Sequence, residues 1–202
     1  MARSRDEIIE EVVGVKEKGY VNNPSDSGGE TNWGVTKNTA KEAKHMWAKY
    51  NWDGNMKTLP LDLAYEIYAT KYWDAMSLDL VLEHNDLIAE KLFDIGINYS
   101  RTRAQEWFQR ILNVMNNKEA LYSDIVVDSD IGGATERAFA AFLKRRGQEG
   151  VEVMWTSLSS FQGVHYLTLS EKREKDEAFT YGWMARRIND DNKNFYKHCR
   201  NI

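Results

Sequence analysis

Two carboxylates and a hydroxyl lie close together in one stretch near the start of the chain. Glu17 is followed nine residues later by Asp26, and Thr31 comes five residues after that. Cleavage of a glycosidic bond needs a proton donor for the leaving oxygen and a second carboxylate that manages the water or the sugar cation. Glu17 fits the donor, because partial burial beside Tyr20 and Trp33 would raise its pKa. Asp26 fits the second carboxylate, and the Thr31 hydroxyl can hold the water.

The same residues allow other interpretations. Glu17 lies between two lysines and could be an ordinary surface charge, while Asp26 could serve only its turn. Glu30 could replace Asp26 as the base that activates water. Trp33 fits a core residue as well as a platform for substrate. Besides the catalytic candidates, we expect a set of neighbouring side chains to bind substrate: Tyr20, Glu30, Asn32 and Trp33.

A turn-rich stretch between two helices must position these groups. Residues 17–36 contain four glycines and a dense series of turn-forming residues. Ser4 and Glu7 form a capping-box pattern, which predicts a helix that runs to about Glu17 and ends at Gly19. Thr36 can cap the next helix, which is expected to continue to about residue 51.

The remainder of the chain reads as helical. The spacing of apolar residues predicts helices over 60–74, 86–99, 102–115, 135–146, 149–170 and 172–188. Phe179 and Trp183 are expected to pack in the core, and Gly96 to mark a close approach of two helices. The sequence therefore predicts an all-α protein with a small turn-rich or β lobe at about residues 18–35. We expect residues 1–95 and 96–202 to form two lobes that pack as one globular unit.

A long motif runs from Glu17 to Thr36 and reads Glu17-x-Gly19-Tyr20-x-Asn22-x-Pro24-x-Asp26-x-Gly28-Gly29-Glu30-Thr31-Asn32-x-Gly34-x-Thr36. This motif resembles the N-terminal signature of glycoside hydrolase family 108. These proteins are phage and prophage endolysins that cleave peptidoglycan glycan strands. Lys18 departs from that signature, which has glycine there. Residues 68–73, 92–98 and 179–186 also resemble segments of the family, and residues 127–135 resemble the start of its peptidoglycan-binding region.

The resemblance implies a lysozyme-like fold and an N-acetylmuramidase that cuts the β-1,4 bond between N-acetylmuramic acid and N-acetylglucosamine for host cell lysis. The order of Glu17, Asp26 and Thr31 in this chain is also similar to the order of the catalytic residues in phage-type lysozymes. The resemblance and the long turn between Glu17 and Asp26 favour inversion at the anomeric carbon, which needs carboxyl groups about 6.5–9.5 Å apart, with room for a water.

Composition limits the partners. With 27 Lys and Arg against 31 Asp and Glu, the net charge is −4, which argues against nucleic acid as a ligand. No apolar run approaches the roughly 20 residues that span a bilayer, and Glu10 and Glu11 interrupt any apolar signal core. We therefore expect a monomer without membrane insertion that stays in the host cytoplasm until a holin releases it to peptidoglycan in the periplasm.

Other classes of protein fit less well. The four histidines, His45, His84, His165 and His198, show no spacing typical of a zinc amidase or peptidase. Asp124, Asp128 and Asp130 lack EF-hand spacing and are expected to cap the next helix. Cys199 has no context typical of a Cys-His peptidase. We expect no metal and no cofactor; a virion-associated or non-catalytic wall-binding protein on the same fold stays as the alternative.

Overall fold

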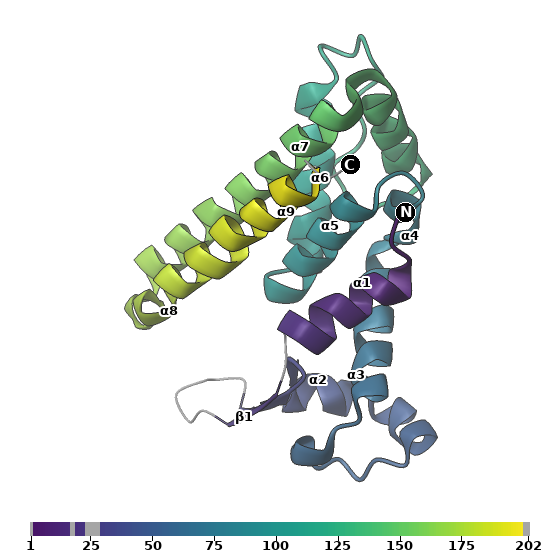
Figure 1. Cartoon of the computed structure of the whole chain (residues 1–202). Coiled ribbons are helices and arrows are strands. Elements are labelled where there is room, and N and C mark those ends of the chain that lie inside the picture. The colour runs from purple at the N-terminus through teal and green to yellow at the C-terminus, as the bar shows by residue number, and fades with distance from the viewer. Residues whose placement is uncertain (1, 17–18, 23–28, 200–202) are drawn as a thin grey trace. The chain divides into compact units, whose positions relative to one another are not determined.

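The chain divides into two compact units, Met1–Asp79 and Leu80–Ile202, in a computed structural model that describes residues 2–16, 19–22 and 29–199. Both units are mainly helical, and the first also holds a small antiparallel sheet (Figure 1). The predicted all-α class with a small β-containing lobe is therefore confirmed.

The first helix follows its predicted bounds. In α1 (Arg5–Glu11), the Ser4 side chain accepts a hydrogen bond from the Glu7 backbone, and the Glu7 side chain accepts one from the Ser4 backbone at 2.7 Å. This reciprocal capping box satisfies two backbone donors at the start of the helix. The helix continues as a π-helical segment, η1 (Val12–Lys16), which ends just before Glu17 in the sequence.

Gly14 lies where η1 meets α3 (Leu61–Tyr68). A Cβ atom on this glycine would lie 2.8 Å from the Tyr65 hydroxyl oxygen, which is closer than side chains approach one another. Glycine therefore permits the close packing of these two helices.

Three short strands follow in the order β1 (Tyr20–Asn22), β2 (Glu30–Asn32) and β3 (Val35–Thr36). Both pairings are antiparallel, with Val21 opposite Thr31 and Thr31 opposite Thr36. Trp33 and Gly34 form the turn between β2 and β3 with φ values of 50° and 71°. Positive φ at both central residues is typical of a tight hairpin turn whose twist matches its strands.

The helices that complete the first unit surround an apolar core. Thr36 caps α2, since its hydroxyl accepts a hydrogen bond from the Thr39 backbone at 3.2 Å. Buried Trp73, Leu63 and Ile67 contribute to the core. The elements after the sheet are α2 (Lys37–Glu42), η2 (Lys44–Tyr50), η3 (Met56–Thr58), α3, η4 (Ala69–Trp73) and η5 (Asp74–Met76).

In the second unit, most predicted helices are present. Residues 135–146 and 149–170 were predicted as separate helices, and the non-helical backbone of Gly147, whose φ is 58° and ψ is −145°, separates them. The first five elements are α4 (Asp79–Leu82, which begins at the unit boundary), α5 (Asp86–Asn98), α6 (Arg101–Met115), α7 (Gly133–Lys172) and η6 (Glu174–Asp176).

The chain then returns along α7 through α8 (Glu177–Trp183), η7 (Met184–Asp190) and α9 (Asp191–Cys199) (Figure 1). This helical segment extends 11 residues beyond the predicted end at residue 188. Near its end, the Gln148 side chain donates a hydrogen bond to Cys199 Sγ at 3.3 Å. The contact joins the last residue of α9 to the residue after the kink in α7.

Two expectations about packing are wrong. The N-cap of α7 is Gly132, which has no capping side chain; Asp128 instead accepts hydrogen bonds from Gln109 and the Asp130 backbone. Phe179 is 49% exposed, because it packs on Trp183 at the surface and not in the core.

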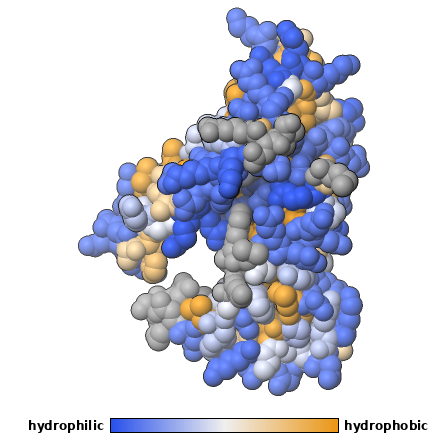
Figure 2. Space-filling model, viewed as in Figure 1, coloured by the Kyte–Doolittle hydropathy of each residue, from blue (hydrophilic) through white to orange (hydrophobic). Residues whose placement is uncertain are grey.

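Hydrophilic residues cover most of the face shown in Figure 2. Among the described residues, none of the helices combines the length and hydrophobicity needed to cross a lipid bilayer.

Candidate active site

Glu30 lies on the small sheet, and both of its carboxylate oxygens accept hydrogen bonds. The Tyr20 hydroxyl donates a hydrogen bond to Glu30 Oε1 at 2.9 Å, and Lys37 Nζ donates one to Oε2 at 2.6 Å. The Lys37 ammonium and then the Tyr20 hydroxyl hold the pKa of Glu30 below its ordinary value, while the bond to Glu30 raises the pKa of Tyr20. Lys57 adds a second positive charge, with Nζ 5.7 Å from the centre of the Tyr20 ring. Glu30 is therefore ionised and poorly suited to donate a proton.

Thr31 lies on the opposite face of the sheet from these groups. Successive side chains of a strand point to opposite faces, and directly opposed residues share a face. Thr31 therefore shares its face with Val21, which is 55% exposed, whereas Tyr20 and Glu30 lie on the other. The Thr31 hydroxyl is half-buried and lies 3.5 Å from the Gly29 carbonyl oxygen, at the limit of hydrogen bonding.

Asn32 is a structural link and not an exposed ligand. Its side chain is 5% exposed, and Nδ2 donates a hydrogen bond to the Met56 carbonyl at 2.8 Å. The bond ties β2 to the segment before α3 and satisfies a polar group that would be costly to bury alone. This arrangement gives Asn32 a role in holding the strand in place.

Trp33 is held at the hairpin turn by its indole nitrogen. Nε1 donates a hydrogen bond to the Leu59 carbonyl at 3.2 Å, and the ring stays partly exposed. The ring lines a shallow cavity of about 580 Å³ with Tyr65 and three glutamates of α1, Glu7, Glu10 and Glu11. Trp33 thus fits neither a fully buried core residue nor an isolated surface residue.

Glu17 and Asp26 lie outside the described residues. In the sequence, Glu17 comes between η1 and β1, and Asp26 comes between β1 and β2. The described elements therefore bracket both predicted carboxylates. Of the predicted site residues, the sheet brings Tyr20 and Glu30 into direct contact and places Thr31 on its other face.

Two family models together match most of the chain. The model described as Glycosyl hydrolase 108 matches residues 10–99, and the model described as Predicted Peptidoglycan domain matches residues 103–188. The chain carries a glycosyl hydrolase 108 domain. It is therefore a glycoside hydrolase with lysozyme-like activity on peptidoglycan, as the resemblance of residues 17–36 implied.

Solved structures support the fold of the glycosyl hydrolase 108 protein. Ten chains of solved structures match, and one of them is described as the structure of Brucella abortus SagA. The similarity has a TM-score of 0.63 at 19% sequence identity and covers 98% of each chain. The predicted lysozyme-like fold is thereby confirmed. No curated protein matches the sequence.

The unit that carries the peptidoglycan domain contains a buried polar network that was not predicted from the sequence. Asp94, 2% exposed, accepts hydrogen bonds from Arg187 at 3.0 Å and Asn98 at 3.0 Å. Gln162 lies 3.4 Å from the second oxygen of Asp94 and accepts a hydrogen bond from buried Lys91 at 2.9 Å. The signal in the sequence was an aspartate within the apolar pattern of residues 92–98. The network joins α5, α7 and η7.

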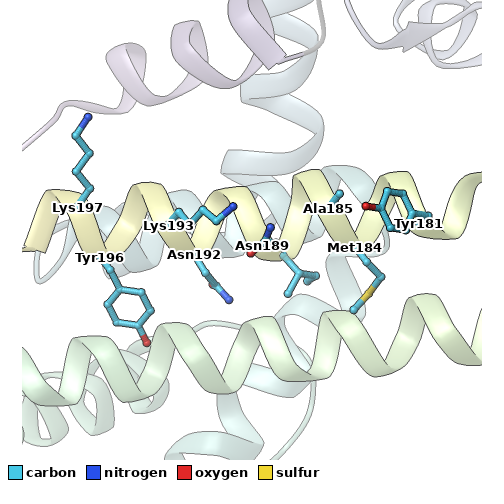
Figure 3. Close-up of a pocket in the computed structure, with 9 residues that line it drawn as sticks. Tyr181, Met184, Ala185, Asn189, Asn192, Lys193, Tyr196 and Lys197 are labelled. Carbon is cyan, nitrogen blue, oxygen red and sulfur yellow. The ribbon is translucent and has the colours of Figure 1, made fainter.

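A cavity of about 750 Å³ lies along the C-terminal helical segment of the glycosyl hydrolase 108 protein (Figure 3). Met184, Asn192 and Tyr196 point from that segment toward α7, whereas Lys197 points away from it. None of the described residues that line the cavity is an aspartate or a glutamate. The cavity therefore lacks a carboxyl proton donor for glycoside hydrolysis.

Within the described ranges, no group of three or more His, Cys, Asp or Glu side chains is arranged to hold a metal ion. His84 illustrates this, since its Nε2 lies 2.6 Å from Glu136 and its ring packs on Phe139. Among the described residues, His84 therefore pairs with one carboxylate and belongs to no larger cluster of metal-binding side chains.

Proposed function

We propose that the chain is an N-acetylmuramidase that hydrolyses the β-1,4 bond between N-acetylmuramic acid and N-acetylglucosamine. In this proposal, Glu17 is the general acid that protonates the leaving oxygen, and Asp26 is the carboxylate that activates the attacking water. The Thr31 hydroxyl orients that water. The match of residues 10–99 to the Glycosyl hydrolase 108 model is the observation that carries the proposal.

The state of Glu30 supports this choice of carboxylates. A catalytic acid must hold a proton at the working pH, whereas Lys37 and Tyr20 favour the ionised form of Glu30. A catalytic base must be free to accept a proton, whereas both oxygens of Glu30 already accept hydrogen bonds. In the proposal, Glu30 therefore fixes β1 to the start of α2 and helps to shape the substrate site, and Asp26 is the base.

The proposal includes inversion of configuration. A water that attacks from the face opposite Glu17 needs room between the two carboxyl groups, which corresponds to a separation of about 6.5–9.5 Å. Thr31 suits a role with that water because, among the described residues, its hydroxyl makes a single long contact, to the Gly29 carbonyl. Proton NMR of the first product formed would distinguish the α-anomer from the β-anomer.

Mass spectrometry of digested peptidoglycan tests the bond. Purified sacculi are incubated with the full chain, and the products are reduced with borohydride before analysis. A muramidase yields products that end in reduced N-acetylmuramic acid. Products that end in reduced N-acetylglucosamine would contradict the proposed bond, and release of peptides with intact glycans would indicate an amidase or peptidase. Glu17→Gln serves as the control for contaminating hydrolases.

We also propose that the enzyme acts as a phage-type endolysin, a monomer that reaches periplasmic peptidoglycan after a holin permeabilises the inner membrane of the host. The resemblance of residues 17–36 to phage and prophage endolysins supports this role. Expression in a Gram-negative host should cause lysis only when a holin is produced with the enzyme. Lysis without a permeabilising partner would contradict the proposed route.

A further inference from the structure

A separate cavity of about 390 Å³ lies wholly within the second unit. Its walls come from the end of α5, the last turns of α7 and the α8–η7 segment. A volume of this size fits one sugar or a short peptide, since small-molecule sites begin at about 300 Å³.

One wall of the cavity is aromatic. The rings of Tyr99 and His165 are stacked with centroids 3.4 Å apart, and Trp107 extends the stack with its centroid 5.3 Å from that of Tyr99. On another side, the Trp183 ring lies 5.4 Å from that of Tyr166. Planar side chains held against one another provide rigid apolar surfaces on which a ligand can pack.

Two guanidinium groups lie in the polar part of the cavity. Arg173 and Arg187 line it, and no carboxylate is among its described lining residues. Arg187 also pairs with buried Asp94, which fixes the position of its guanidinium. Arg173 is half-exposed, and its Nε lies 2.8 Å from Asp176 Oδ2 without the geometry of a hydrogen bond.

The pKa of His165, which also lines the cavity, is lowered from its ordinary value. Burial, followed by the positive charges of Arg173 and Arg103, lowers the pKa of His165, which favours its neutral form near pH 7. The groups around the imidazole include Tyr99 and Tyr166 besides the two arginines. A site with rigid rings and guanidinium groups suits an anionic ligand that carries apolar surface.

We propose that this cavity binds a muramyl peptide of peptidoglycan, with its carboxylate at Arg173 and its apolar face against the aromatic wall. The proposal rests on peptidoglycan being the substrate and adds a binding site in the second unit. In a muramyl peptide the lactyl carboxyl of muramic acid is joined to the peptide as an amide, so the carboxylate belongs to the peptide. It presents to Arg173 a planar anion that a guanidinium can bind with two hydrogen bonds.

Calorimetric titration of the full chain tests the site. The Glu17→Gln background prevents turnover, and the probes are muramyl dipeptide, N-acetylmuramic acid and tri-N-acetylglucosamine. Arg173→Gln should weaken binding of muramyl dipeptide about tenfold, the effect of about one charge-assisted hydrogen bond. Arg110→Gln is the matched control, because Arg110 is 48% exposed and also pairs with a carboxylate, yet does not line the cavity. It should change affinity less than about twofold.

A second pair of variants tests the cavity by volume. Leu169 lines the cavity, whereas Leu167 is 49% exposed on the same helix and does not. Leu169→Trp should fill the site and weaken muramyl dipeptide about tenfold or more, while Leu167→Trp should leave the affinity unchanged. Thermal melts establish that each variant is folded. Binding that neither Arg173→Gln nor Leu169→Trp weakens would overturn the proposal, as would the absence of binding.

The remaining probes locate the carboxylate. A clear preference for muramyl dipeptide would support the peptide carboxylate, whereas tighter binding of N-acetylmuramic acid, whose lactyl carboxylate is free, would contradict a muramyl peptide as the ligand. Binding of tri-N-acetylglucosamine, which has no carboxylate, should be insensitive to Arg173→Gln. These titrations need no hydrolysis, so failure of the proposed bond specificity would appear only in the product analysis.

Discussion

Arg187 Nη1 donates a hydrogen bond to Asp94 Oδ1 at 3.0 Å and thereby connects η7 to α5 across 93 positions of the sequence. Asp94 is 2% exposed and the Arg187 side chain 20% exposed, so water screens this ion pair little. Asn98 donates a second hydrogen bond to the same carboxylate. The pair is therefore a candidate for the strongest polar link in the second unit.

Arg187→Met should destabilise the fold by about 3–5 kcal/mol, because it leaves the buried Asp94 carboxylate without its cation. Denaturant unfolding measures the loss. Asp190→Asn is the control, since the Lys193–Asp190 pair is exposed and should contribute less than about 1 kcal/mol. The double variant Asp94→Leu with Arg187→Met should recover part of the loss, because it removes both charges. Equal losses for Arg187→Met and Asp190→Asn would contradict this account.

Glu17→Gln should reduce turnover on purified sacculi by about 10²–10⁴-fold while the protein stays folded, because it removes the proton that acid catalysis needs. Asp26→Asn should also impair the rate strongly. Thr31→Ala should have a smaller effect, since one hydroxyl contributes a hydrogen bond of about 0.5–1.5 kcal/mol. Rates of release of soluble muropeptides provide the measurement.

Glu30→Gln is the decisive comparison for the second carboxylate. If Asp26 is the base, Glu30→Gln should keep most of the turnover once the variant is compared at a temperature where it is folded. A normal rate for Asp26→Asn together with an inactive Glu30→Gln would assign the base to Glu30. A near-normal rate for folded Glu17→Gln would remove the mechanism altogether.

Stability of the first unit should depend on pH through Glu30. Its pKa in the folded protein is lowered from the ordinary value of 4.5, first by Lys37 and then by Tyr20. A group with a lowered folded pKa stabilises the protein fully above its unfolded pKa and loses that contribution as the pH falls through the folded value. The difference in melting temperature between the wild type and Glu30→Gln should therefore be largest above about pH 5 and shrink below 4.5. A difference that stays constant between about pH 3 and 7 would show that Glu30 does not contribute through its charge.

Gly14→Ala should reveal the close contact with Tyr65. Alanine gains about 1 kcal/mol of helix propensity over glycine, but its Cβ would lie 2.8 Å from the Tyr65 hydroxyl oxygen. The substitution should therefore be neutral or destabilising in the wild type and stabilising in a Tyr65→Phe background, where that oxygen is absent. A double-mutant cycle on the free energy of unfolding measures the coupling. Additive effects would mean that Tyr65 moves aside without cost.

Local signals in the sequence predicted the helix starts well. Ser4 and Thr36 cap their helices as expected, because a capping side chain bonds to a backbone group only two or three residues away. The motif of residues 17–36 likewise predicted a family that the comparison confirmed.

Contacts between distant residues were not predictable in the same way. Asn32 was expected to bind substrate, yet its amide bonds to a carbonyl 24 residues away. Glu30 and Thr31 face opposite ways because successive residues of a strand alternate, but the residues of β1 that share each face depend on the strand register, which the sequence pattern did not predict. Asp94 pairs with Arg187, 93 residues away, so no local pattern in the sequence indicates this contact.

The hydrogen bond from Gln148 places Cys199 at a position that suits a fluorescent label. Cys199 is the single cysteine of the sequence and lies beside the residue that follows the Gly147 kink. Partial burial raises the pKa of its thiol, so coupling to a maleimide dye should proceed faster in mildly alkaline buffer than at neutral pH. A fluorophore attached there without further mutagenesis would report bending of α7 and fraying of α9 during spectroscopy of the native protein.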